Sequence, residues 1–199
     1  MEESLCILIH CLKKKGQAPT SADGREFDPF NHFIDLDELE GLIKRLLALG
    51  YKFILPHQAK KGDKKICSLT FDDGYHNNSW FLPLAEKYQI PFIIFMSSYN
   101  VMHQVPFIWD LHEYQHLQAW NAAGGNYLSL YEDLNAEQIR PLMTDFYRPF
   151  KIIEIKELVT HPLVFIAPHS HTHRPTVRSY SSDEDLDFEI NENLSLIHI

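Results

Sequence analysis

Residues 66–74 read ICSLTFDDG, a short apolar run that ends abruptly in two aspartates and a glycine. Runs of this length that stop at a turn signal are typical of buried strands. A helical stretch expected at 78–88 and a second apolar run at 92–96 complete a β-α-β unit, whose two strands are parallel. The two carboxylates then lie at the carboxyl edge of the sheet, where parallel α/β folds bind ligands.

The rest of the chain repeats this alternation of apolar runs and amphipathic stretches, which predicts an α/β fold around a mostly parallel sheet. Asp35 and Gly50 are the expected N-cap and C-terminal stop of one helix. Further buried strands are expected at 5–9 and 163–166, and another strand at 53–55. Further helices are expected at 36–49, 136–146, 152–159 and 182–197.

The last of these helices has a clear start signal and an apolar stripe. Ser181 and Glu184 have the spacing of a capping box. We expect the stripe to face the core and the acidic side to be exposed. The stripe consists of Leu186, Ile190, Leu194 and Ile197.

Charge and composition exclude several classes of function. The chain has 199 residues and a formal net charge of −9, which argues against binding to nucleic acid because phosphate backbones attract basic surfaces. Its three cysteines have no paired spacing, so neither a zinc ribbon nor a disulfide framework is expected. No secretory signal and no apolar run of about 20 residues is visible, so we expect a cytoplasmic protein without a membrane span. The oligomeric state is left open.

A cluster of histidines follows the last predicted strand, where residues 168–173 read PHSHTH. In a turn, the imidazoles of His169 and His173 can point the same way and share one cation. In an extended strand they would lie about 13 Å apart, so this interpretation requires a turn. One carboxylate of Asp72 and Asp73 would complete a site of two histidines and one carboxylate, and the other would be free to act as a base.

Each half of this candidate site also has an ordinary structural explanation. Adjacent aspartates before a glycine often form a simple turn. Histidine-rich loops are often solvated and have no function, and His171 in particular can point away from any site. The pairing of the two clusters, each after a buried strand, favours a metal site.

The same residues carry a family resemblance. Thr70-Phe71-Asp72-Asp73-Gly74 resembles the TFDDG motif of the polysaccharide deacetylases, which share the NodB homology domain of carbohydrate esterase family four. The run from His169 to His173 resembles their second motif, His-(Ser/Thr)-x-x-His. Further similar segments are 8–10, 39–55 and 107–110, so the resemblance covers most of residues 5–197.

This resemblance implies a distorted (β/α) barrel of the glycoside hydrolase/deacetylase type. It implies a metal-dependent hydrolase that removes N-acetyl or O-acetyl groups, with N-acetyl favoured, from a polysaccharide or sugar precursor. Asp73, His169 and His173 match the family's metal ligands, and Asp72 matches its general base. The implied cofactor is a divalent metal ion, with zinc expected and cobalt or nickel as alternatives, and the implied partner is an acetylated carbohydrate.

The chain departs from the family pattern after His173. The later motifs, including the one that supplies the catalytic acid, have no counterpart there. We therefore expect residues 1–199 to form a single deacetylase-like domain with an incomplete barrel that lacks its C-terminal third. The last residues, LSLIHI at 194–199, resemble a translated sequencing adaptor, which suggests an artificial terminus. An inactive or carbohydrate-binding fragment is the alternative function.

A third hypothesis comes from residues 112–116, which read HEYQH. This matches the HExxH signature of zinc metallopeptidases, in which two histidines on one helical face bind the metal and the glutamate is the base. His112 and His116 would be ligands, Glu113 the base and Glu132 a third ligand. The chain has 12 histidines, so a chance match is a serious alternative, and the surrounding aromatic and aliphatic residues suit an ordinary core helix.

Overall fold

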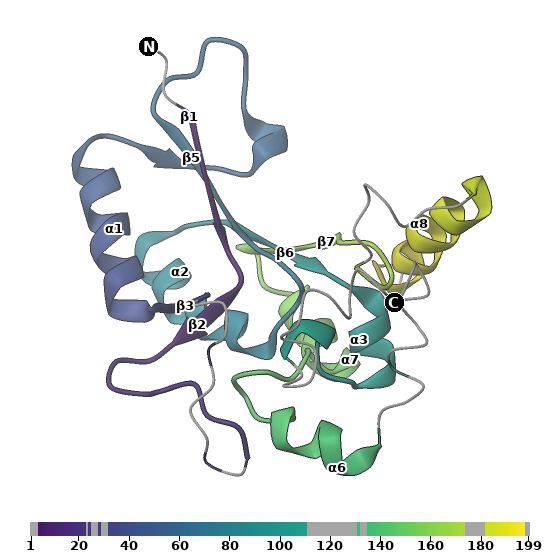
Figure 1. The fold of residues 1–199 in the computed structure, drawn as a ribbon. Coiled ribbons are helices and arrows are strands. Elements are labelled where there is room, and N and C mark those ends of the chain that lie inside the picture. The colour runs from purple at the N-terminus through teal and green to yellow at the C-terminus, as the bar shows by residue number, and fades with distance from the viewer. Residues whose placement is uncertain are drawn as a thin grey trace.

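The computed structural model describes residues 4–22, 24, 28, 32–110, 131, 135–173 and 182–197 (Figure 1). The strands are β1 Ser4–Ile9, β2 Cys11–Lys13, β3 Phe33–Asp35, β4 Lys52–Phe53, β5 Ile66–Phe71, β6 Phe92–Met96 and β7 Val164–Pro168. The α-helices are α1 Leu36–Ala48, α2 Leu82–Tyr88, α3 Ser98–His103, α6 Ala136–Ile139, α7 Ile152–Leu158 and α8 Asp183–Ile197. The 3-10 helices are Pro56–Gln58, His76–Phe81, Ile108–Asp110 and Arg140–Leu142.

A parallel sheet organises the fold and confirms the predicted α/β class. Its main path runs β1-β5-β6-β7. The short strand β4 pairs with the start of β5, and β6 pairs with the end of β5. Among the described strands, β1 pairs only with β5 and β7 only with β6. Because β5, β6 and β7 are parallel neighbours, their carboxyl ends lie at one edge of the sheet. That edge is where the predicted polar clusters follow their strands.

The hydrophobic core forms around the central strands. The side chains of β5 are buried from Cys67 to Phe71, and Phe71 packs against Phe81 and Phe92 at ring distances of 5.4 and 5.5 Å. Helix α1 begins as predicted, because the Asp35 carboxylate accepts a hydrogen bond from the backbone N–H of Asp37. Burial of this apolar surface is the main favourable term that holds the strand ends in place.

Several predicted elements differ in extent or burial. The side chains of β1 are mostly exposed and only Ile9 is buried, so the expectation of a fully buried strand was wrong. This strand has a pairing partner on only one side among the described strands. Helix α6 ends at Ile139, well before the expected residue 146, and continues as a 3-10 helix that contains Pro141. Proline has no N–H to donate to an α-helical hydrogen bond.

Helix α8 lies against β7 and α3 (Figure 1). Its extent was predicted, but its buried side was not. The apolar residues Leu186, Ile190 and Leu194 are exposed, whereas Glu189 and Asn193 are each 1 % exposed. No helix of the described residues is long and apolar enough to cross a membrane.

Candidate metal centre

A tight turn at the carboxyl end of β5 presents the two aspartates. Asp73 and Gly74 have φ angles of +72° and +90°, and the N–H of Gly74 donates to the carbonyl of Asp72 at 2.9 Å. A Cβ at position 74 would lie 3.1–3.3 Å from Cγ, Cα and Cβ of Met96. Both the backbone angle and the close approach of β6 therefore favour glycine at this position.

A second turn follows β7 and carries the histidines. Ser170 and His173 have φ angles of +60° and +59°, a left-handed conformation that costs about 1–2 kcal/mol for a residue with a side chain. These two left-handed residues fold the chain back, so that Nε2 of His169 lies 3.1 Å from Nε2 of His173. The predicted turn is present, although it is not helical.

The two turns bring three ligand atoms together. Oδ1 of Asp73 lies 3.2 Å from Nε2 of His173 and 3.6 Å from Nε2 of His169. Ligand atoms that share one divalent ion, each about 2.0–2.2 Å from it, stand about 3.0–3.5 Å apart. The triangle fits such an ion, and it is the one group of this kind among the described residues.

Asp72 lies beside this triangle. Its Oδ2 is 3.7 Å from Nε2 of His169, and its Oδ1 is buried and accepts no hydrogen bond from the described residues. Burial, and then the neighbouring charge of Asp73, raises the pKa of Asp72 to about 6. A carboxylate with a pKa close to neutrality is suited to take up and release a proton.

The two histidines differ in their electrostatic surroundings. Burial, and then the charge of His173, lowers the pKa of His169 to about 4. Burial also lowers the pKa of His173, but the hydrogen bond and charge of Asp73 outweigh it and raise the pKa above its usual value. A histidine must give up the proton on its ligating nitrogen before it binds a metal ion. His169 is therefore available to a cation at neutral pH.

Trp109 packs against His173 and belongs to a hydrogen-bonded chain with Tyr75 and Asp110, which was not predicted from the sequence. The indole ring of Trp109 packs against the His173 ring at 4.7 Å, and its N–H donates to the hydroxyl of Tyr75 at 2.8 Å. That hydroxyl donates to Asp110, which is completely buried. Burial raises the pKa of Asp110 well above its usual range. In the sequence, the aromatic segment at 107–110 carries only a family resemblance and no sign of this contact.

The third histidine of the cluster, His171, points elsewhere. Its Nδ1 lies 2.7 Å from the hydroxyl oxygen of Ser98, and its ring packs edge-on against Phe188. His171 therefore joins the histidine turn to α3 and α8. The peptidase hypothesis cannot be compared with the structure in this way, since His112, Glu113, His116 and Glu132 lie outside the described residues.

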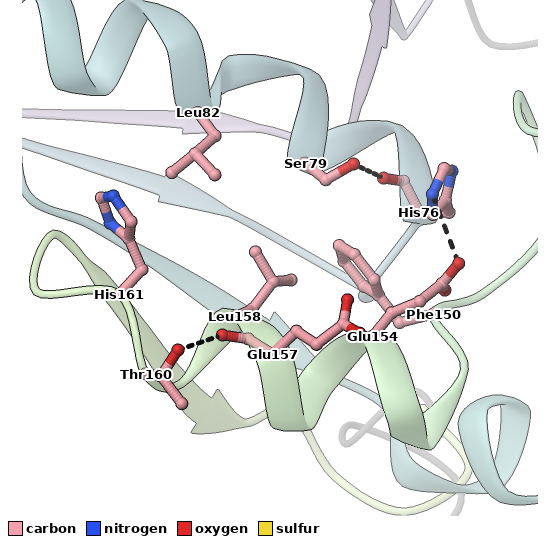
Figure 2. A pocket seen from close by; sticks show the side chains of 9 residues that line it. All are labelled: His76, Ser79, Leu82, Phe150, Glu154, Glu157, Leu158, Thr160 and His161. Carbon is pink, nitrogen blue, oxygen red and sulfur yellow. Dashed lines mark hydrogen bonds and ion pairs between the residues drawn. The ribbon is translucent and has the colours of Figure 1, made fainter.

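A separate cavity of about 360 Å³ lies between α7 and the segment that leads into α2 (Figure 2). Figure 2 shows His76 and Glu154 in contact on one side of it, with His76 Nε2 and Glu154 Oε1 3.6 Å apart. None of the candidate metal ligands lines this cavity, so it is distinct from the metal centre. Its lining residues are His76, Ser79, Leu82, Phe150, Glu154, Glu157, Leu158, Thr160 and His161.

The fold and the site define an α/β protein with a candidate divalent-metal centre at the carboxyl edge of its sheet. The polysaccharide deacetylase family model matches residues 59–198, and the chain belongs to this family. A search of curated proteins gives no match.

Solved structures support the same fold. A de-N-acetylase from Aggregatibacter actinomycetemcomitans is similar with a TM-score of 0.53 and 16% identity, over 84% of this chain and 54% of that one. A polysaccharide deacetylase from Bacillus cereus is similar with a TM-score of 0.55 and 15% identity, over 97% and 47%. The deacetylase PplD from Streptococcus pyogenes, in complex with acetate, has a TM-score of 0.55 and 12% identity, over 96% and 66%. The chain thus spans about half the length of the first two.

Proposed function

We propose that this chain carries the metal centre of a deacetylase that hydrolyses acetyl groups, N-linked rather than O-linked, on a carbohydrate. Asp73, His169 and His173 are the proposed ligands of a divalent ion, with zinc expected, and Asp72 is the proposed general base. The observation that carries the proposal is the triangle of ligand atoms 3.1–3.6 Å apart. The family match and the similarity to a structure described as a de-N-acetylase support the choice of reaction.

The division of labour follows from the positions of the side chains. When bound, a divalent ion polarises an acetyl carbonyl and lowers the pKa of a water molecule. Asp72 lies at the border of the triangle and has a carboxylate oxygen that accepts no hydrogen bond from the described residues, so it can take a proton from that water. Asp73 is buried beneath both histidines, where its negative charge favours a cation. The products would be acetate and a free amine.

Metal stoichiometry of the purified protein tests this proposal. We expect the wild type to hold about one equivalent of zinc, measured by elemental mass spectrometry. We expect His169→Ala/His173→Ala to lose the ion and His112→Ala/His116→Ala to retain it. Loss of the ion only in the second double variant would favour the metallopeptidase, and a metal-free wild type would refute the proposed centre.

Release of acetate from an N-acetylated sugar oligomer tests the reaction itself. A metal-loaded wild type that releases acetate supports a deacetylase. A metal-loaded protein that binds the oligomer without releasing acetate would favour the carbohydrate-binding alternative.

A further inference from the structure

Helix α8 buries polar side chains against the histidine turn. Glu189 and Asn193 stand one helical turn apart and are each 1 % exposed, while the neighbouring Ile190 is 47% exposed. Buried polar groups are costly unless they are hydrogen-bonded, so their partners show what this side of the helix does. Most of those partners lie in residues 169–172, and the other two, reached by Asn193, are Met96 and Ser98.

Glu189 holds the residue that directly precedes His173. Its Oε2 accepts a hydrogen bond of 2.7 Å from the backbone N–H of Thr172, and its Oε1 accepts one from the Thr172 hydroxyl. The backbone carbonyl of Glu189 also accepts from the N–H of His171 at 3.0 Å. Thr172 is itself 1 % exposed, so these bonds are shielded from water. Hydrogen bonds to an ionised acceptor are the stronger kind.

Asn193 holds the other end of the turn. Its side-chain Oδ1 accepts a hydrogen bond of 3.1 Å from the backbone N–H of His169. Its Nδ2 donates to the carbonyl of Met96 at 2.9 Å and to the carbonyl of Ser170. One side chain therefore ties the start of the turn to the end of β6, which lies between the two strands that carry the ligands.

The turn needs such support because its backbone is unfavourable by itself. Ser170 and His173 both adopt the left-handed conformation, which residues with side chains avoid. In this backbone conformation the two Nε2 atoms lie 3.1 Å apart. The hydrogen bonds from α8 reach Ser170, which is one of these two left-handed residues, and Thr172, which directly precedes the other.

We propose that Glu189 and Asn193 are positioning residues for the metal centre. They hold the 169–173 backbone in its ligating conformation before the ion arrives, so that binding does not require the turn to fold. This role rests on the proposed metal centre. Removal of residues that orient metal ligands typically weakens metal binding by about 10- to 100-fold.

Cobalt(II) binding to the purified full chain tests the role, because visible absorption reports both affinity and ligand geometry. The test variants are Glu189→Gln and Thr172→Val, which alter the same contact from its two sides. The control is Asp187→Asn, which also neutralises a carboxylate of α8 but at an exposed position. We expect each test variant to bind cobalt about 10- to 100-fold more weakly, with shifted absorption bands, and the control to match the wild type.

The double variant Glu189→Gln/Thr172→Val should lose less affinity than the two single losses combined, because Thr172→Val removes a hydroxyl contact that Glu189→Gln also weakens. If Glu189→Gln does not fold, Thr172→Val still tests the contact from the turn. Wild-type affinity and spectra in both test variants, whatever their stability, would show that α8 is merely structural and overturn the inference. A wild type that binds no cobalt would instead overturn the metal centre and this role with it.

Discussion

The hydroxyl of Tyr75 donates a hydrogen bond of 2.7 Å to Oδ2 of Asp110, and both side chains are completely buried. The same hydroxyl accepts the indole N–H of Trp109, whose ring lies against His173. Tyr75 thus connects a buried carboxylate to a candidate metal ligand. Because Oδ1 of Asp110 accepts no hydrogen bond from the described residues, the tyrosine contact is central to keeping this acid buried.

Tyr75→Phe should therefore destabilise the protein by about 1–3 kcal/mol, since it removes the hydroxyl that donates to the buried Asp110 side chain and accepts from the Trp109 N–H. Chemical denaturation measures this loss. Tyr88→Phe is the matched control, because it removes a hydroxyl that donates to Glu40 nearer the surface, and it should cost less. Equal losses in the two variants would contradict the importance of the buried chain.

Asp72→Asn tests whether Asp72 acts as the general base and not as a metal ligand. Asparagine has a similar shape but cannot take up a proton, so acetate release should fall by about 10²- to 10⁴-fold while the metal content stays unchanged. Asp187→Asn, an exposed change of the same kind, should keep full activity. If Asp72→Asn loses the metal, Asp72 is a ligand and not the base.

The ion pair of Arg148 and Glu154 should make stability depend on pH. The guanidinium donates to both carboxylate oxygens of Glu154 at 2.8 and 2.9 Å. Burial raises the pKa of Glu154, but these bonds and the Lys151 N–H outweigh it, so the pKa is lowered. A lowered pKa means that the contribution is present above the unfolded value of 4.5 and is lost as pH falls through the folded value.

Glu154→Gln should accordingly destabilise the protein by about 1 kcal/mol at pH 7, and the difference from wild type should shrink below about pH 4. Urea denaturation at several pH values measures it. His76 also faces this carboxylate, and burial lowers its pKa, so it is mainly neutral at pH 7 and its charge does not contribute there. A difference that stays constant from pH 7 to pH 3 would refute the assignment.

Gly74→Ala should be more damaging than an alanine at another glycine with the same backbone angle. Gly62 has a φ of +95°, but no atom lies within 4 Å of the place that a Cβ would take, so Gly62→Ala incurs only the conformational cost of about 1–2 kcal/mol. Gly74→Ala adds the contact with Met96 and should exceed that loss. Thermal or urea denaturation of the two variants provides the comparison, and equal losses would show that β6 simply moves away.

Strands β5 and β6 could be predicted because they are buried on both faces, whereas β7, which carries the histidines, is partly exposed and lies at 164–168 rather than the expected 163–166. Strands β5 and β6 match the expected ranges residue for residue, since continuous apolar runs bounded by turn residues leave little choice. The meeting of Asp73 with His169 and His173 also followed from the rule that parallel strands end at one edge. Their roles as ligands stay a prediction until metal binding is measured.

The buried side of α8 could not be predicted in the same way. Its apolar stripe indicates one orientation, but the hydrogen bonds of Glu189 and Asn193 to the histidine turn select another, in which the helix is rotated and the side next to the stripe is buried. Those bonds involve backbone atoms whose positions exist only once the turn has formed. Likewise, the left-handed angles of Ser170 and His173 have no signal in their residue types, since neither is glycine.

Two independent constraints act on position 74, and they have a consequence for genetic suppression. Shortening Met96 would remove its Cγ from the neighbourhood of an alanine at 74, but the Met96 Cα would remain 3.3 Å away and the φ of +90° would be unchanged. A suppressor screen that starts from Gly74→Ala should therefore recover reversion to glycine and no rescue by substitutions at Met96 alone. No single substitution in the neighbouring strand β6 would then compensate for the loss of glycine from the aspartate turn.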